Sequence, residues 1–290
     1  MANVYQMVTD RIVEQMSKGE IPWQKPWTCG FGEGVAISYT SRKAYSFLNQ
    51  LLLGKPGEWL TWKQIETLKG TVKKGAKSRF VVFYQMAEFK EENEETGEVK
   101  IKKVPILKWY RVFHIDDTEG IDSKIEKVEA NPDITPIEEA ERVITDYVER
   151  ERTATGFTFI NDRESASAYY SPFRDEVVVP MLSQYAIPEE YYSTTFHELT
   201  HSTMHEKRCD RRNENKVAAH GDSNYSREEL VAELGAAMLC NRIGIEAEKA
   251  FKNSVAYIQS WMKALKNDPK MIVWASGRAE KAAKYILNEA

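Results

Sequence analysis

The sequence has few cysteines and no long apolar run. Its three cysteines, Cys29, Cys209 and Cys240, are far apart, and none forms a Cys-x-x-Cys pair. This spacing argues against a disulfide framework and against a cysteine zinc site, and it favours a reducing compartment. No run of about 18 apolar residues is present, so no membrane-spanning segment is predicted. Residues 1–6 lack the basic and apolar parts of a secretory signal, so we expect a cytoplasmic protein.

Charge and tryptophan are distributed unevenly along the 290 residues. Residues 1–125 carry 19 Lys and Arg against 16 Asp and Glu, whereas the remaining residues carry 21 against 28. Six acids of the first half lie within residues 88–98, and five of the seven tryptophans lie in that half. A basic, tryptophan-rich half followed by an acidic half predicts two units with different partners.

A polar stretch with several helix and strand breakers separates the two halves. Asn131-Pro132 and Thr135-Pro136 interrupt it, as is typical of a linker. We therefore predict one domain at residues 1–125 and a second at residues 137–290, joined by a linker at residues 126–136.

Both halves contain segments with strand character among predicted helices. In the first half, residues 78–84 and 106–113 predict the two strands of a long hairpin, with the acidic stretch 88–98 as its loop. In the second half, residues 157–160, 167–170 and 176–179 predict three short strands. The last of these is a candidate sheet edge to which an extended peptide adds as a strand.

The segment Phe196 to His201 is the most informative part of the sequence. His197 and His201 are four residues apart, so on a helix they lie about 40° apart around the axis and can reach one metal ion. Glu198 lies between them in the position of a general base. The spacing predicts a zinc-hydrolase helix. The alternative is an exposed helix face without a metal.

A catalytic zinc site of this kind needs a third protein ligand. His205 is eight residues from His197, which is about 12 Å along a helix and too far for both to bind one ion. The extended motif with a third histidine also fails, because Met204 and Lys207 occupy its positions. The third ligand is therefore expected to be an acid on a later helix.

Two glutamates one turn apart on the next predicted helix meet this need. We assign Glu229 as the third ligand and Glu233 as an acceptor for the N–H of a ligand histidine. An alternative remains open, because Ser226 and Glu229 also match a capping box, which would satisfy Glu229 without a metal. Tyr225 and His220 are candidate electrophiles, with purely structural roles as the alternative.

Aromatic and basic residues alternate in the first half. Aromatic faces stack on the bases of single-stranded nucleic acid while cations follow its phosphates, so the pattern predicts binding of single-stranded DNA. The segment Lys73 to Arg79 is the sharpest candidate for phosphate binding. The alternative is that the tryptophans are core residues and the lysines are solvated. The candidate DNA-binding residues are Trp23, Lys25, Trp27, Arg42, Trp62, Lys63, Lys73, Lys74, Lys77, Arg79 and Tyr84.

In combination, these segments resemble the ArdC antirestriction family over nearly the whole chain. The resemblance is carried by residues 20–27, 70–84 and 112–120 together with the motif at residues 196–201. It implies an α+β fold, with an N-terminal domain that binds single-stranded DNA and a C-terminal zincin-like metallopeptidase domain. Members are carried by conjugative plasmids and protect incoming DNA from host restriction. The family's metallopeptidase motif falls on His197, Glu198 and His201, and its next helix on Glu229 and Glu233.

Two hypotheses follow. In the first, the protein is an antirestriction protein of a mobile element, and its gluzincin-like peptidase acts on a host restriction protein or another protein near the entering DNA. In the second, it binds single-stranded DNA without catalysis, and the metal supports the fold. Zn²⁺ is the expected ion, with Mn²⁺ or Co²⁺ as alternatives. Acidic DNA mimicry fits poorly, because the aromatic half is basic outside one loop.

Overall fold

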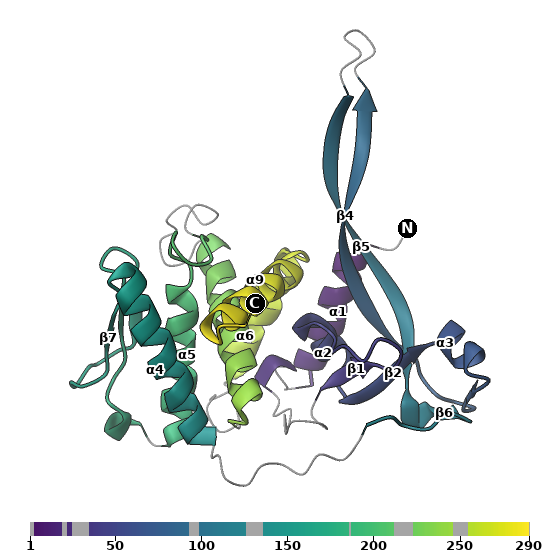
Figure 1. Cartoon of the computed structure of the whole chain (residues 1–290), viewed down its shortest axis with the longest axis horizontal. Helices are drawn as coiled ribbons and strands as arrows, with labels where there is room; N and C mark the ends of the chain where they lie inside the picture. The colour runs from purple at the N-terminus through teal and green to yellow at the C-terminus, as the bar shows by residue number, and fades with distance from the viewer. Residues whose placement is uncertain are drawn as a thin grey trace.

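Two groups of elements lie side by side in the computed structural model of the chain (Figure 1). The structure describes residues 3–18, 22–24, 35–92, 99–125, 136–185, 187–211, 223–245 and 255–289. Among the helices of these residues, none has the length and apolar character needed to cross a membrane. Cys209 and Cys240 are buried free thiols, and Cys29 lies outside the described residues.

The first group carries most of the strands. Its elements are α1 (Val4–Met16), the 3-10 turn η1 (Pro22–Gln24), β1 (Ala36–Ser38), α2 (Phe47–Leu53), β2 (Gly57–Thr61), α3 (Trp62–Thr67), β3 (Thr71–Val72), β4 (Arg79–Glu92), β5 (Val99–His114), η2 (Ile115–Asp117) and β6 (Thr118–Glu119). A sheet in the order β1-β2-β5-β4 forms its centre, and β3 pairs with β6.

The second group is mainly helical. Its elements are α4 (Pro136–Thr155), β7 (Thr158–Ile160), β8 (Tyr169–Ser171), β9 (Glu176–Val178), η3 (Leu182–Gln184), α5 (Pro188–Ser202), α6 (Ser223–Ile243), α8 (Val255–Asn267) and α9 (Met271–Ile286). The start of α5 has a proline in its first turn, followed by Glu189 and Glu190, where acids favour the positive end of the helix dipole.

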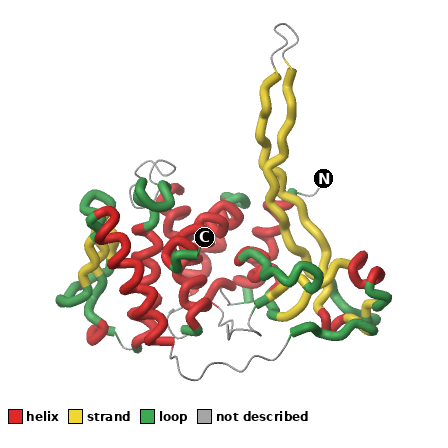
Figure 2. The backbone as a smooth tube through the Cα atoms, in the orientation of Figure 1, coloured by secondary structure: helices red, strands yellow, loops and turns green. Residues whose placement is uncertain are grey.

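The predicted hairpin is confirmed, and its strands are longer than the sequence indicated. β4 and β5 pair in antiparallel fashion from Arg79 to Glu92, and the hairpin projects far from the body of the protein (Figure 2). Part of the acidic stretch belongs to β4, because the register places Glu88 opposite Lys103 and Glu91 opposite Lys100.

The three short strands of the second group are confirmed, but the predicted free edge is wrong. The order is β7-β9-β8, with β9 parallel to β7 and antiparallel to β8. Residues 176–178 therefore form the central strand, whose two sides are both paired. The run is fully apolar in Val177 to Val179 because it is buried between neighbours. The outer strand that lies against α5 is β8.

One hydrophobic core contains residues from both halves of the chain. Val8 and Ile12 of α1 pack in the same cluster as Leu230 of α6, Leu265 of α8 and Ile272 of α9. The side-chain hydroxyl of Thr9 also donates to the backbone oxygen of Pro269 at 2.9 Å. The first helix therefore packs on the C-terminal helices. Residues 126–135 of the predicted linker lie outside the described residues.

Trp23 belongs to this shared core. Its side chain is 0% exposed, and its ring meets Trp261 edge-to-face with 6.4 Å between the ring centres. A ring that is fully enclosed cannot stack on a base, so the position of Trp23 contradicts its prediction as a DNA contact. Edge-to-face pairs of this kind add to the energy of burial.

Helices α5 and α6 approach closely at a glycine. A Cβ atom on Gly235 would lie 2.5 Å from Cγ2 of Thr200, a distance that real Cβ atoms do not reach. Thr200 has no exposed surface, and its hydroxyl donates to the backbone oxygen of Phe196 at 2.7 Å. The threonine therefore has little freedom to move away, and the absence of a side chain at Gly235 sets the distance between the two helices.

We predict opposite effects for alanine at two helical glycines. Gly235→Ala should lower the free energy of unfolding by about 1–3 kcal/mol, because the new methyl group overpacks the α5–α6 contact. Gly277→Ala in α9 should raise it by up to about 1 kcal/mol, because a Cβ there meets nothing within 4 Å and alanine is the better helix former. Denaturant unfolding of both variants checks this, and equal shifts would contradict the close contact.

Candidate functional site

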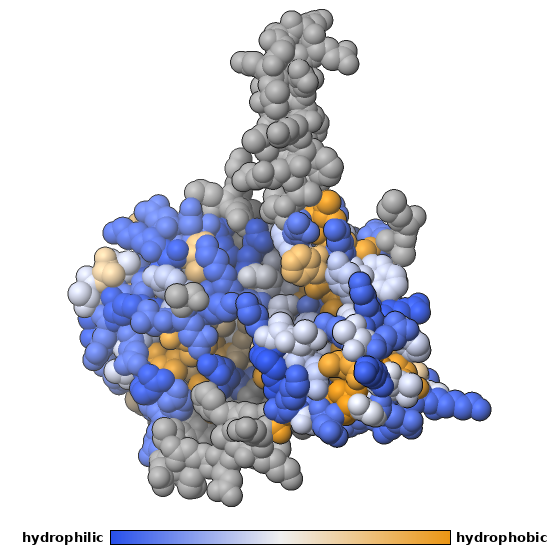
Figure 3. Space-filling view, turned by 45° about the vertical axis from the view of Figure 1, so that its right-hand side comes forward, coloured by the Kyte–Doolittle hydropathy of each residue, from blue (hydrophilic) through white to orange (hydrophobic). Residues whose placement is uncertain are grey.

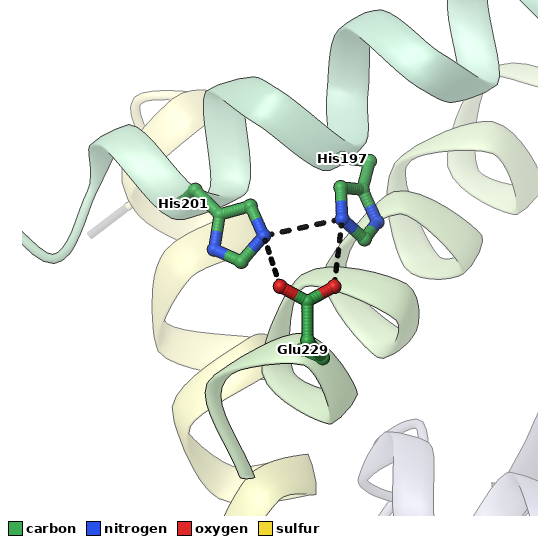
Figure 4. Close-up of side chains that lie close together, drawn as sticks. All are labelled: His197, His201 and Glu229. Atoms are coloured by element: carbon green, nitrogen blue, oxygen red, sulfur yellow. Dashed lines mark hydrogen bonds and ion pairs between the residues drawn. The ribbon is translucent and has the colours of Figure 1, made fainter. Parts of the chain in front are cut away.

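Three side chains from two helices converge on one point. His197 and His201 lie on α5, and Glu229 lies on α6 and points toward both rings (Figure 4). One donor atom from each residue lies within 4.8 Å of the other two. The histidine spacing brings the rings together locally, whereas Glu229 reaches them only through the packing of α6 on α5. The three residues have intermediate exposure, so the cluster is partly open to solvent.

The distances within the cluster suit a divalent cation. The two Nε2 atoms are 3.1 Å apart, and the carboxylate oxygens of Glu229 lie 3.5 Å from Nε2 of His197 and 3.4 Å from Nε2 of His201. Metal–ligand distances of about 2.0–2.1 Å place neighbouring ligands of a tetrahedral ion roughly 3.3–3.4 Å apart. The donor set of two imidazoles and one carboxylate also matches the ligands that zinc and related ions take.

The electrostatics of the cluster favour positive charge between the acids. Burial alone would lower the pKa of His201, but Glu228 and Glu229 outweigh it and raise the pKa to about 10. Burial likewise opposes ionisation of Glu229, yet the two histidines hold its pKa well below the usual range. A cation at this point would take the place of the proton and satisfy the same carboxylate charge.

The capping-box alternative for Glu229 is excluded by the start of α6. The helix begins at Ser223, so Ser226 and Glu229 both lie inside it rather than at its N-cap. A capping box can form only at a helix start, where backbone N–H groups lack partners. The carboxylate of Glu229 is directed to the two histidines instead.

Glu228 and Arg211 support the cluster and were not predicted from the sequence. Glu228 is buried, and its Oε1 lies 3.7 Å from Nδ1 of His201, on the side of the ring away from the cluster. Arg211 donates to the two oxygens of Glu228 at 3.2 and 2.7 Å, and also to Oγ1 of Thr203 at 2.8 Å. A carboxylate behind a ligand histidine fixes the orientation of the ring. The only signal in the sequence was the adjacent pair Glu228-Glu229.

The other predicted residues of the site are placed as follows. Glu198 lies on α5, 8% exposed, about 60° around the helix axis from His201. Glu233 lies on α6, one turn beyond Glu229, with intermediate burial, and its assigned contact to a ligand histidine stays a prediction. His220 lies outside the described residues, and Tyr225 is in α6 with a side chain that the structure does not describe.

A basic cavity of about 620 Å³ lies beside the predicted phosphate-binding segment. Lys77 and Arg79 line it together with Arg11 of α1 and Lys55, while Asp117 contributes an acid. Burial and the positive charge of Arg11 lower the pKa of Arg79. Cations held this close to one another attract an anion. Lys73 and Lys74 are exposed next to the cavity, and Lys73 donates to the backbone oxygen of Asp116 at 2.7 Å.

The remaining DNA-binding candidates are scattered. Trp62 and Tyr84 are exposed by 53% and 54%, and Lys63 is exposed beside Trp62. The guanidinium of Arg42 pairs with the fully buried carboxylate of Glu58, so it already has a partner inside the protein. Lys25 and Trp27 lie outside the described residues.

Comparison with known protein families gives two matches, one in each half. Residues 2–113 match the N-terminal domain of the anti-restriction factor ArdC, and residues 146–278 match a zincin-like metallopeptidase domain. The three residues of the cluster all lie within the second match. The boundary between the two matches includes the predicted linker.

Similar proteins are found among curated sequences. Two proteins called DNA primase TraC, both from Escherichia coli, are 28% and 30% identical over 98% of this chain. The chain spans only 20% and 27% of their respective lengths.

Two solved structures match over the full length of the chain. Both are of the antirestriction ArdC protein from the R388 plasmid. The metal-free form is 31% identical with a TM-score of 0.72, and each chain covers 100% of the other. The Mn(II)-bound form is 30% identical with a TM-score of 0.72, covering 99% of this chain and 98% of that one. The chain therefore belongs to the ArdC family of antirestriction proteins.

Proposed function

We propose that this protein binds single-stranded DNA, carries a divalent-metal-dependent peptidase site, and protects incoming DNA from host restriction. The observation that supports the peptidase site best is the convergence of His197, His201 and Glu229 beside Glu198. The names of its relatives support a role on DNA, because they include an antirestriction protein and DNA primases.

The residues of the metal site would have different roles. His197, His201 and Glu229 would hold the ion, and Glu228 with Arg211 would fix the ring of His201. When bound, a divalent ion would supply a Lewis acid that polarises a carbonyl and acidifies water. Glu198 would accept a proton from the attacking water and pass it to the leaving amine. An extended peptide would reach the site along β8, the outer strand beside α5.

We propose Zn²⁺ as the ion, with Mn²⁺ as the alternative. Two imidazoles and one carboxylate form a common ligand set of catalytic zinc. A related ArdC structure is bound to Mn(II), which supports a site for a divalent ion in this family. Among the described residues three donors meet at the cluster, and a catalytic site leaves one position open for substrate, whereas a structural zinc site takes four protein ligands.

Single-stranded DNA would bind along the first half. The basic cavity at Lys77 and Arg79 offers charge for a phosphate, and exposed rings such as Trp62 and Tyr84 offer faces for bases. The shared core joins this surface to the helices of the metal site, so DNA binding would hold the peptidase close to proteins that act on the entering strand. We propose the cytoplasm as the place of action.

We predict that binding of a divalent ion requires all three converging residues. His197→Ala and Glu229→Ala should each abolish stoichiometric binding of Zn²⁺ and Mn²⁺, measured by calorimetry on metal-stripped protein. Glu228→Gln should weaken binding by about 10- to 100-fold, because it loosens the ring of His201. His205→Ala is the matched control, since His205 lies on the same segment but outside the cluster. Unchanged stoichiometry in Glu229→Ala would remove it from the ligand set.

We predict that Glu198→Gln keeps the ion and loses hydrolysis. The substitution preserves shape but removes the base, so cleavage of β-casein by metal-loaded protein should fall by about 10²- to 10⁴-fold. Restriction of a conjugated plasmid in a host with an active restriction system provides the second measurement. If the variant protects the plasmid as well as the parent while it binds metal equally, protection does not depend on catalysis, and the metal serves the fold.

We predict salt-dependent binding of single-stranded DNA that depends on the basic cavity. Lys77→Ala should weaken binding of a fluorescent oligo(dT) strand, and should flatten the plot of log affinity against log salt by about 0.7 for one lost phosphate contact. Lys207→Ala, an exposed lysine near the end of α5, is the control and should match the parent. Equal slopes for both variants would argue against a phosphate at the cavity.

A further inference from the structure

A second groove lies where the two halves of the chain meet. It has a volume of about 690 Å³, within the range of small-molecule sites. Tyr45, Val82 and Tyr84 line it from the first half, and Trp274 and Gly277 of α9 line it from the second. Hydrophobic residues gather beneath the projecting hairpin on this side of the molecule (Figure 3).

The wall on the hairpin side is held rigidly. Asn49 of α2 is buried, and its side chain makes two hydrogen bonds with the backbone of Val82. It donates to the carbonyl oxygen at 2.9 Å and accepts from the N–H at 2.8 Å. β4 is an outer strand of its sheet, so these bonds fix it to α2. Tyr84 is two residues further on and therefore faces the same side as Val82.

The groove combines flat rings with positive charge. The ring of Tyr84 is 54% exposed. On the opposite wall, the guanidinium of Arg278 lies 4.0 Å from the ring centre of Trp274. Lys270 adds a further cation, and the one acid of the lining, Glu280, is paired with Lys284 at 3.2 Å. Nucleobases stack on aromatic rings and on arginine planes, and lysines neutralise the phosphates of the nucleic-acid backbone.

Gly277 lines the groove with bare backbone. It lies in the interior of α9, where glycine is the least favourable residue after proline. A Cβ atom at Gly277 would meet nothing within 4 Å, so no packing contact requires a glycine there. A glycine that packing does not need, on the wall of a groove, is typical of a place where a ligand approaches the backbone. The ligand would then lie between Tyr84 and α9.

We propose that this groove binds a base of single-stranded DNA between Tyr84 and the Trp274–Arg278 pair. The DNA site would then continue from the first half of the chain onto α9, and would not end with the N-terminal family match at residue 113. The inference rests on the proposed binding of single-stranded DNA. In this groove a base would be held by stacking, whereas at the cavity beside Lys77 a phosphate would be held by charge.

The test uses the full chain and a fluorescent oligo(dT) strand. Tyr84→Ala and Gly277→Leu should each weaken binding about fivefold or more, because one removes a stacking face and the other fills the groove. The slope of log affinity against log salt should stay that of the parent, since no phosphate contact is lost. Tyr84→Phe keeps the ring and should bind as the parent does. Ala154→Leu adds the same leucine to an exposed position of α4 and should also be neutral.

Ultraviolet crosslinking to an oligonucleotide with 5-bromodeoxyuridine gives an independent readout. Crosslinked peptides should include Tyr84 or Trp274. If the parent and Lys207→Ala bind no DNA, the proposed function itself is wrong. If they bind and Lys77→Ala weakens binding, but Tyr84→Ala and Gly277→Leu bind as the parent does, only the groove is wrong. Crosslinks confined to residues outside the groove would also overturn the proposal that the groove binds a base. A protein partner would then be the remaining candidate to occupy the groove.

Discussion

The close contact of α5 with α6 is the constraint on which the metal-binding cluster depends. His197 and His201 are positioned by one helix, but the third donor comes from another, so a wider spacing of the two helices would separate it from them. Gly235 allows the approach at Thr200, and Arg211 links Glu228 of α6 to Thr203 just beyond the end of α5. The chemistry proposed for the site therefore depends on the packing of α5 against α6 at Gly235, a residue that takes no part in the reaction.

The shared core joins the two proposed sites in one body. Packing of α1 on α8 places the first helix of the chain among the last ones, so one hydrophobic core connects the surface proposed for DNA with the helices of the metal cluster. The sequence predicted two units because charge and tryptophan change abruptly along the chain. Composition reports what each half shows to its surroundings, and it carries no information on which apolar faces of the two halves are buried against each other.

Local patterns were predicted well, and contacts between distant segments were not. The spacing of His197 and His201, the proline at the start of α5 and the two strands of the hairpin all follow from neighbouring residues, and the structure has them. Glu229 was reached by excluding His205 and by a charge argument, and the structure places it at the histidines. Arg211 and Glu228 were missed because they meet only in the folded chain. The prediction for Trp23 was wrong because an aromatic residue in a basic segment can face either the core or the solvent. The prediction of a free edge at β9 was wrong because the sequence of a strand does not determine its place in the sheet.

The two bonds from Asn49 to Val82 have a consequence for how the protein behaves in a crowded solution. An outer strand with open backbone groups invites a strand from another chain, and long strands such as β4 are the ones most exposed to such association. The amide of Asn49 satisfies the N–H and the carbonyl of Val82 as a neighbouring strand would. The outer edge of the sheet is thereby covered at Val82, where its aromatic wall begins, and a strand from another chain cannot pair at that residue.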